Sequence, residues 1–252
     1  MSVTSTQIEL AARPVGDPKP SDFKIVNADL PEIKEGEMLC RIIYQSLDPY
    51  MRGRMDDAKS YAVPVAIGSV MEAGCVAEVM ESKNARFQSG DMGNGRLGWR
   101  THIISDGAGV RKVNKDIAPI STSIGILGMP GMTAYVGLLD IGEPKEGETV
   151  VVSAASGAVG AVVGQIAKIK GCKVIGVAGS KEKCEYVRDE LGFDECISHY
   201  NEDLATQLSN VCPNGIDVYF ENVGGKVFEA VLPLLNAFAR IPLCGLISRY
   251  SH

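Results

Sequence analysis

The stretch that decides the fold is VVVSAASGAVG, from Val150 to Gly160. Its apolar, β-branched start stops at small residues, and a helical pattern follows at once. Branched apolar residues recur there at spacings of three and four positions: Val159, Val162, Val163, Ile166 and Ile169. A strand, a tight turn of small residues and a helix is the arrangement that receives the pyrophosphate of a dinucleotide.

The turn itself carries the predicted phosphate contacts. Gly157 lets the backbone approach the phosphates, and Gly160 lets the helix lie close to the strand. The unpaired N–H groups of the first helical turn would face the anion. We therefore predict that the cofactor contacts Ala155, Ser156, Gly157, Ala158, Val159 and Gly160. The match is to A-x-G-x-x-G, not to the full glycine triplet, so an ordinary strand–loop–helix is the alternative.

The end of the next predicted strand, residues 173–178, indicates which dinucleotide binds. An NAD-binding unit usually carries Asp or Glu there, about 20 residues past the fingerprint. This chain has Ala178-Gly179-Ser180, with Lys181 and Lys183 just beyond. The missing carboxylate leaves room for a 2′-phosphate, the lysines supply positive charge, and Ser180 is a predicted N-cap. These features favour NADPH over NADH, with Gly179 and Lys183 in the cofactor site; the alternative is that the lysines are ordinary surface residues.

Composition narrows the class of protein. The chain has 252 residues, 45% of them hydrophobic, and a net charge of −6. The acidic balance and the lack of a basic stripe argue against nucleic acid as a partner. No apolar run reaches the ~18 residues needed to span a bilayer, so no membrane association is expected. The N-terminus shows no secretory signal, so we expect a cytoplasmic protein.

Cysteine and histidine spacing indicates neither a disulfide framework nor a metal site. The seven cysteines include no C-x-x-C pair, and the three histidines include no H-E-x-x-H. A catalytic zinc needs about three protein ligands, and no local spacing supplies them, so we predict no metal. Four cysteines in or beside apolar segments are expected to behave as small hydrophobes: Cys172, Cys184, Cys196 and Cys244.

The pattern of apolar residues along the chain changes near residue 122. Residues 1–122 contain short apolar runs at 38–43, 75–80 and 102–104, broken by Gly, Pro and Asp, as in a β-rich domain. Residues 123–252 alternate strands with helices, which predicts a doubly wound parallel sheet of the α/β class. The expected strands are 150–153, 173–178, 195–198, 216–221 and 240–245, and the helices after the second, third and fourth of these are 181–191, 203–211 and 226–235. A two-halved dinucleotide fold has six strands, so a sixth strand is either supplied otherwise or lost with a truncated end.

Five segments together resemble one family. They are SLDPYMR at 46–52, LGMPGMTAY at 127–135, AASGAVG at 154–160, ENVGG at 221–225 and CGLISRY at 244–250. The set is similar to the zinc-free medium-chain dehydrogenase/reductase superfamily, and within it to the leukotriene/prostaglandin reductase branch. The resemblance implies a GroES-like catalytic domain in 1–122 and a Rossmann NADPH-binding domain in 123–252. It also implies that the sixth strand, which builds the homodimer of the full-length protein, and a C-terminal return segment are missing.

The resemblance further implies NADPH-dependent reduction of the carbon–carbon double bond of α,β-unsaturated ketones or aldehydes (enones). Asn222 would bind the cofactor, Tyr200 would lie near the adenosine phosphate, and Thr133 would contact the carboxamide. Residues Cys244, Gly245 and Tyr250 would line the nicotinamide side. For Asn222 the structural alternative is a simple Asn-Val-Gly-Gly turn. For Tyr200 it is a half-buried tyrosine at the sheet edge, and for Thr133 a threonine in the core of a helix. Quinone reduction on the same scaffold and non-catalytic NADPH binding are the alternative functions.

The chemistry requires a group that stabilises negative charge. Hydride goes to the β-carbon of the enone, and charge develops on the carbonyl oxygen, where a positioned hydroxyl donor is suited. Tyr250 is the first candidate, from its place after the fifth strand and the family match. Tyr61 and Tyr50 are secondary candidates. For Tyr50 the alternative is a structural Asp48-Pro49-Tyr50 turn, with Arg52 pairing Asp48.

Overall fold

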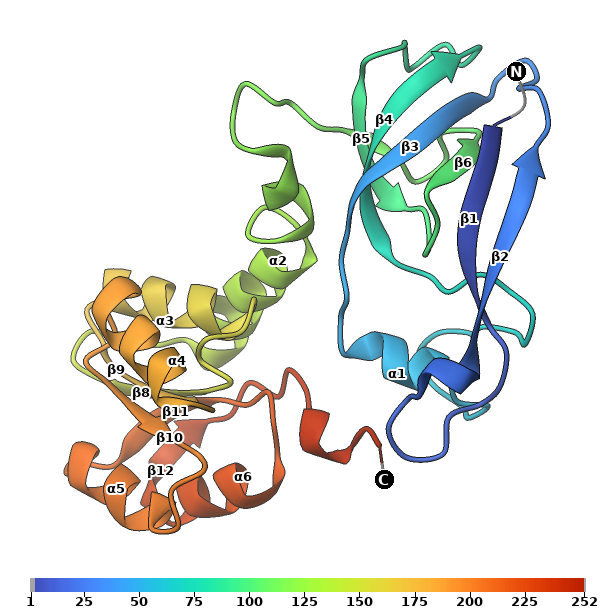
Figure 1. Cartoon of the computed structure of the whole chain (residues 1–252). Helices are drawn as coiled ribbons and strands as arrows, with labels where there is room; N and C mark the ends of the chain where they lie inside the picture. The colour runs from blue at the N-terminus through green and yellow to red at the C-terminus, as the bar shows by residue number, and fades with distance from the viewer. Residues whose placement is uncertain (1–2, 252) are drawn as a thin grey trace. The chain divides into compact units, whose positions relative to one another are not determined.

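The computed structural model describes residues 3–251, and it divides into two units after Ile124 (Figure 1). The first unit is built on an antiparallel sheet with strand order β6-β3-β4-β5-β7, beside the hairpin β1-β2. The strands are β1 (Val3–Leu10), β2 (Phe23–Leu30), β3 (Met38–Gln45), β4 (Gly74–Ser82), β5 (Met92–Arg96), β6 (His102–Ser105) and β7 (Arg111–Lys112). The first unit also holds helix α1 (Tyr50–Arg54) and the 3-10 turns η1 (Pro20–Asp22) and η2 (Ile120–Ile124). The three apolar runs predicted as strands in this part of the chain all lie in the sheet, in β3, β4 and β6.

The second unit, Gly125–Tyr250, is a parallel five-stranded sheet with order β10-β9-β8-β11-β12. The strands are β8 (Thr149–Ser153), β9 (Lys173–Ala178), β10 (Glu195–Ser198), β11 (Ile216–Phe220) and β12 (Leu235–Arg240). The chain winds outward from β8 to β10 and then returns to the other side of β8. Ligands of such sheets bind beyond the carboxyl ends of the strands at this reversal, which lies between β8 and β11.

Helices cover both faces of the parallel sheet (Figure 1). They are α2 (Met129–Val136), α3 (Gly160–Ile169), α4 (Lys181–Glu185), α5 (Leu204–Val211) and α6 (Gly225–Val231), with the π turns η3 (Gly137–Gly142) and η4 (Tyr186–Glu190) and the 3-10 turns η5 (Leu232–Leu234) and η6 (Ile247–Arg249). Alternate residues of β8 point to opposite faces: Val150 and Val152 pack with α3, and Val151 packs with α5 and α6. The doubly wound fold is therefore confirmed. Within residues 3–251, no helix has the length and apolar character needed to cross a membrane.

The fifth strand differs from its prediction. We expected residues 240–245, but β12 is Leu235–Arg240, and a bulge in β12 leaves Phe238 exposed with φ of 64°. Beyond Arg240 the chain still follows β11, but only through the isolated bridge Glu221–Leu243. Pro242 has no N–H to donate, so a regular ladder cannot continue through this segment.

Two predicted helices also end differently. The helix expected over 181–191 changes from α4 to the π turn η4, where the N–H of Leu191 bonds Tyr186 five residues back. Gly192 follows it with φ of 74°, as a helix-ending glycine should. The helix expected over 226–235 ends as α6 at Val231, because Pro233 cannot donate to a longer α-helix and Leu235 is already extended.

All seven cysteines are free thiols in the structure. Cys172 and Cys184 are buried and Cys196 is half-buried, as expected of small hydrophobes in apolar segments. The prediction for Cys244 is wrong, because this residue lies beyond the end of β12 and is exposed.

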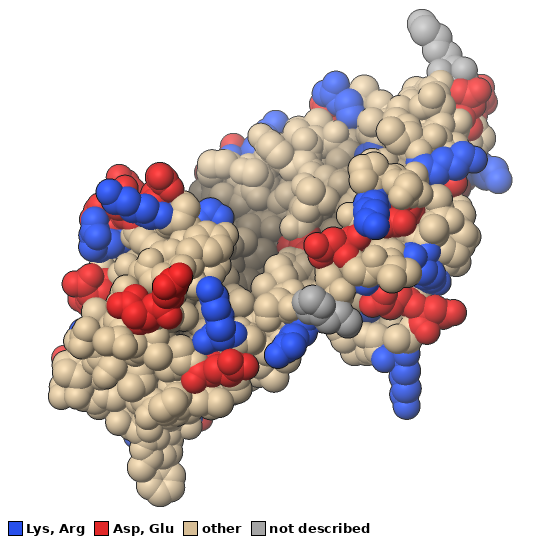
Figure 2. All heavy atoms as spheres, turned by 60° about the horizontal axis from the view of Figure 1, so that its bottom comes forward, with Lys and Arg blue, Asp and Glu red and all other residues tan. Residues whose placement is uncertain are grey.

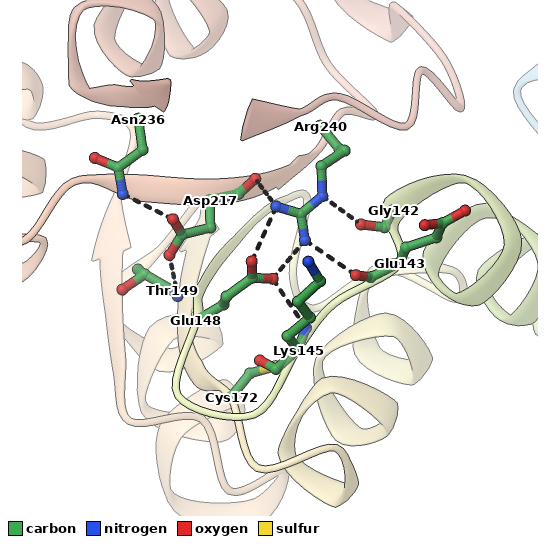
Figure 3. A network of polar contacts seen from close by, with 9 residues as sticks. All are labelled: Gly142, Glu143, Lys145, Glu148, Thr149, Cys172, Asp217, Asn236 and Arg240. Carbon is green, nitrogen blue, oxygen red and sulfur yellow. Dashed lines mark hydrogen bonds and ion pairs between the residues drawn. The ribbon is translucent and has the colours of Figure 1, made fainter. Parts of the chain in front are cut away.

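At the amino-terminal edge of the parallel sheet, Arg240 joins four chain segments (Figure 3). Its guanidinium donates to the carbonyls of Gly142 and Glu143 at 2.9 and 3.0 Å, and to the carbonyl of Asp217 at 3.2 Å. It also forms a two-pronged ion pair with Glu148, which stands directly before β8. Such bidentate pairs are among the stronger polar contacts in proteins.

This ion pair predicts an acid-dependent loss of stability. Partial burial raises the pKa of Glu148, but the hydrogen bonds and charge of Arg240 outweigh it, so the pKa lies below its ordinary value. A lowered folded pKa stabilises the fold above the unfolded value and loses that effect as the pH falls through the folded value. Glu148→Gln should therefore cost about 2–3 kcal/mol in the free energy of unfolding at neutral pH, from charged hydrogen bonds. The difference from wild type should shrink below about pH 4.

Urea unfolding at neutral and acidic pH measures this effect. The matched control is Arg188→Gln, which breaks the exposed Arg188–Asp189 pair and should hardly change the free energy of unfolding at either pH. A Glu148→Gln cost that stays constant with pH would show that the ion pair does not produce it.

Candidate functional site

The turn after β8 presents free N–H groups at the reversal of the sheet. The N–H of Ala155 bonds Val177 at 3.0 Å, and that of Gly157 bonds Ala154 at 2.9 Å. Those of Ser156, Ala158 and Val159 have no acceptor among residues 3–251. These three donors stand next to the N-terminus of α3, so the turn can receive an anion.

Glycine is needed at two points of this turn for different reasons. A Cβ on Gly160 would lie 2.4 Å from the carbonyl oxygen of Ala154, so a side chain there would force the helix away from the strand. A Cβ on Gly157 would lie 3.1 Å from the same oxygen, and Gly157 itself is only partly buried. The turn therefore fits the phosphates of a dinucleotide. Gly160 lets the helix pack close to the strand, and Gly157 places no side chain between the backbone and a phosphate.

The other four residues predicted in the turn differ in exposure. Ala155 is fully buried and packs into the core beneath the turn, so its backbone and not its side chain shapes the site. Ala158 is exposed, and Ser156 and Val159 are partly exposed.

A second group of predicted residues meets at the ends of β9 and β10. The Oγ of Ser198 donates to the carbonyl of Gly179, and a Cβ on Gly179 would lie 3.5 Å from the Tyr200 ring. Ser180 caps α4 by accepting the N–H of Lys183 at 3.4 Å, as predicted. The structure thus places Gly179, Lys183 and Tyr200 at the sheet edge where β9 and β10 end.

Positive charge gathers at this edge. Burial and then the nearby charge of Lys226 lower the pKa of His199, with a further contribution from Lys183. In the described residues Lys183 has no carboxylate within ion-pair distance, whereas Lys181 lies 3.7 Å from Glu185. A phosphate with its negative charge suits this edge, and Lys183 is the lysine free to meet it.

A third group lies where β11 ends. The side-chain amide of Asn222 donates to the carbonyl of Ser153 at 2.7 Å, and its backbone N–H donates to the Ser153 hydroxyl at 2.7 Å. The carboxylate of Glu221 is fully buried beside them. Asn222 therefore stands at the sheet reversal, next to the end of β8, where a cofactor would lie.

The segment after β12 folds back onto the same turn. Cys244 and Gly245 donate their N–H groups to the carbonyl of Glu221, at 2.9 and 3.1 Å. The hydroxyl of Tyr250 accepts the N–H of Leu246 at 3.3 Å, and only a glycine at 245 leaves room for it, since a Cβ would lie 2.8 Å away. The described residues offer no acceptor to the hydroxyl hydrogen of Tyr250, so this group can donate.

Thr133 lies on α2, and its hydroxyl donates to the carbonyl of Met129 at 2.8 Å. Its hydrogen is therefore committed within the helix, and only its lone pairs can meet a ligand.

The two secondary tyrosines lie in the first unit and share one arginine. The guanidinium of Arg54 stands 5.6 Å from the centre of the Tyr50 ring and 4.5 Å from that of Tyr61. Arg54 is 2% exposed and pairs with Glu72 at 2.6 Å, whereas Tyr61 is 83% exposed. Burial raises the pKa of Tyr50, and the charges of Glu72 and Asp48 raise it further, so this phenol is neutral near pH 7.

The alternative ion pair proposed for Tyr50's turn is wrong. Asp48 accepts from the hydroxyl of Ser46, and Arg52 pairs instead with Asp56 one helical turn later. Asp48 and Asp56 both lie four residues from Arg52, but Asp48 precedes α1 and accepts the Ser46 hydroxyl, so spacing alone did not identify the partner.

Residues 3–251 contain no group of three or more His, Cys, Asp or Glu side chains placed to hold a metal ion. The three predicted groups lie at the carboxyl ends of β8, β9, β10 and β11.

Sequence reasoning missed three residues: Glu221 and His199 at the parallel sheet, and Arg54 in the first unit. The signal for Glu221 was an acidic residue directly after an apolar strand and before Asn-Val-Gly-Gly. His199 sat beside the predicted Tyr200. For Arg54, no pattern in the sequence pointed to contacts with both tyrosines.

Two family models match the chain: an N-terminal domain of oxidoreductase over residues 6–113, and a zinc-binding dehydrogenase over residues 158–252. The chain belongs to the medium-chain dehydrogenase/reductase superfamily, in the branch that contains the prostaglandin reductases. Within this branch, the five segments taken together also resemble bacterial curcumin reductase.

Individual relatives agree with this placement. The NADPH-dependent curcumin reductase of Escherichia coli (strain K12) is 56% identical, over 96% of this chain and 70% of the relative. The NADP-dependent 2-alkenal reductase of Nicotiana tabacum is 45% identical, over 99% of this chain and 74% of the relative. The crystal structure of CurA from Vibrio vulnificus in complex with NADPH is 58% identical with a TM-score of 0.94, over 98% of this chain and 73% of that one.

Proposed function

We propose that this protein is an NADPH-dependent oxidoreductase that reduces the carbon–carbon double bond of enones and alkenals. The observation that carries the proposal is the 58% identity, at a TM-score of 0.94, to a structure solved with NADPH. The relatives named for curcumin and 2-alkenal reduction act on double bonds conjugated to a carbonyl. The free N–H groups after β8 would receive the pyrophosphate. Lys183 would meet the 2′-phosphate, and Asn222 would meet the nicotinamide half.

Bound NADPH would supply the hydride. The turn at residues 155–160 would hold the pyrophosphate, and Gly179, Lys183 and Tyr200 the adenosine phosphate. Asn222 and the segment from Cys244 to Tyr250 would hold the nicotinamide half, with Thr133 contributing an acceptor. Tyr250 would donate its hydroxyl hydrogen to the oxygen on which charge develops, where such a donor acts most strongly.

Consumption of NADPH with a simple enone tests the proposal. We expect turnover with NADPH, much less with NADH, and no loss after treatment with a chelator, since we propose a zinc-independent reaction. Turnover of quinones without turnover of enones would replace this proposal with the quinone reductase. NADPH binding without either reaction would indicate a non-catalytic protein.

Tyr250→Phe should lower turnover more than it weakens NADPH binding. The lost donor would act mainly in the transition state, so kcat should fall while the NADPH dissociation constant stays close to wild type. Losing one such donor elsewhere costs on the order of 10²–10³; a ribose hydroxyl of the cofactor could share the task here, so we expect about tenfold or more. Wild-type turnover in this variant would transfer the role to Tyr61 or Tyr50.

We further propose a small-molecule substrate, a cytoplasmic location and a homodimer. On the face drawn in Figure 2, Lys and Arg side chains are interspersed with Asp and Glu and form no continuous basic stripe for nucleic acid. Seven free thiols suit a reducing compartment. The homodimer is proposed for the full-length protein, because the resemblance implies that a sixth strand beyond β12 builds it. Light scattering tests the dimer.

A further inference from the structure

The carboxylate of Glu221 is the most completely enclosed charged group near the candidate site. It is 0% exposed. Its Oε1 accepts the hydroxyl of Ser153 at 2.9 Å and the N–H groups of Val223 and Gly224 at 2.5 and 3.0 Å. Its Oε2 accepts the hydroxyl of Tyr219 at 2.8 Å. With four donors on its two oxygens, the buried carboxylate is hydrogen-bonded on both sides.

These hydrogen bonds connect Glu221 to the residues of the turn after β11 and to the end of β8. Ser153 ends β8 and in turn accepts the backbone N–H of Asn222. Val223 and Gly224 form the turn itself, and Gly224 has φ of 76°, a conformation suited to glycine. The carboxylate therefore holds this turn in place through hydrogen bonds to its backbone and links it to the end of β8.

The same turn holds the segment that carries Tyr250. The backbone carbonyl of Asn222 accepts the N–H of Ile247 at 3.2 Å, and that of Val223 accepts the N–H and hydroxyl of Ser248 at 3.0 and 2.6 Å. A shift of the turn would therefore move residues 244–250 with it.

The arrangement also decides which atom of Asn222 faces a ligand. Only the NH₂ of its amide can donate to the carbonyl of Ser153, so its Oδ1 is the atom left to accept. A ribose hydroxyl or a carboxamide NH₂ of a cofactor's nicotinamide half is the matching donor.

We propose that Glu221 is a positioning residue for the nicotinamide half of NADPH. It touches neither cofactor nor substrate; it holds Oδ1 of Asn222 and the segment of Tyr250 where that half binds. This proposal rests on the proposed use of NADPH. It assigns nothing to the adenosine half, whose candidate residues at the ends of β9 and β10 make no bond to Glu221.

The test compares two ligands on the same variants. Adenosine 2′,5′-bisphosphate carries the 2′-phosphate half alone, and NADPH carries both halves. Glu221→Met removes both carboxylate oxygens, which accept from the turn, and Ser153→Ala removes the hydroxyl that links Glu221 to Asn222. Both variants should bind NADPH at least about tenfold more weakly, the effect of losing one charged hydrogen bond. Both should bind the bisphosphate within about twofold of wild type, on a scale where tenfold is 1.4 kcal/mol.

Two further variants keep the result separate from a general loss of stability. Tyr219→Phe removes only the hydrogen bond to Oε2, which comes from β11 and not from the turn. It should lower the melting temperature and hardly change the affinity for either ligand. Glu221→Gln keeps an acceptor for the turn, with its NH₂ toward the Tyr219 oxygen, and should recover most of the NADPH affinity lost in Glu221→Met. It also serves if Glu221→Met does not fold.

The outcomes are distinct. Equal weakening of NADPH and the bisphosphate would show that Glu221 acts only through the fold, and unchanged NADPH binding in folded Ser153→Ala would overturn the positioning role. If wild type binds the bisphosphate but gains nothing from the nicotinamide half of NADPH, the proposal fails while an adenosine site stands. If wild type binds neither ligand, the proposed function fails as well.

Discussion

Gly157→Val should remove NADPH binding almost completely while the protein stays folded. The branched side chain would crowd the partly exposed turn after β8, next to the free N–H groups of Ser156 and Ala158. An anion could then no longer reach these donors. We expect the dissociation constant to rise by at least about 100-fold, or roughly 2.7 kcal/mol.

The fold should survive because the strain is small. The new Cβ would lie 3.1 Å from the carbonyl oxygen of Ala154, a contact relieved by a shift of a few tenths of an ångström. Gly160→Ala is the contrasting variant: its Cβ would lie 2.4 Å from the same oxygen, so it should cost about 1–3 kcal/mol or more in stability. Fluorescence titration with NADPH and thermal unfolding measure the two effects. Unaltered affinity in Gly157→Val would mean that the turn is structural only.

Lys183→Ala should discriminate between the two dinucleotides. The ammonium group of Lys183 is exposed and, within residues 3–251, has no carboxylate partner, so it is available to a 2′-phosphate. A hydrogen bond to a charged group is worth roughly 1.5–3 kcal/mol, so NADPH binding should weaken by about one to two decades. NADH has no 2′-phosphate, and its binding should hardly change.

Lys181→Ala is the matched control, because Lys181 stands two residues away on the same helix and pairs with Glu185. It should affect neither cofactor beyond the weak influence of a surface charge. Equal losses for NADPH and NADH in Lys183→Ala would remove its role at the 2′-phosphate. The salt dependence gives a second check, since an exposed charge pair weakens as salt is added.

Much of the parallel sheet could be predicted from local pattern. The strands at 173–178 and 195–198 have the predicted bounds, and the strand before the glycine turn differs by one residue. Their apolar side chains face cores on both sides, so the residues themselves carry the signal. The N-cap at Ser180 was equally local, because a cap depends on residues three positions apart.

The fifth strand could not be predicted in the same way. Residues 240–245 have the apolar pattern of a strand, yet the ladder with β11 forms earlier, through Leu235 and Arg240. The sequence shows which residues favour an extended chain. Which of them pair depends on the neighbouring strand and on the proline that interrupts the donors.

The sequence by itself determined the α/β fold, the glycine turn and the family, because strand and helix periods, glycine positions and motif order are all properties of neighbouring residues. Only the tertiary structure decided the partners of buried charges. Ser153 and Glu221 are 68 residues apart, and Glu148 and Arg240 are 92 apart. No spacing along the chain encodes such pairs, since they form only where the folded sheet brings distant segments side by side. Burial then selects them, because a charged side chain removed from water must find every partner it needs.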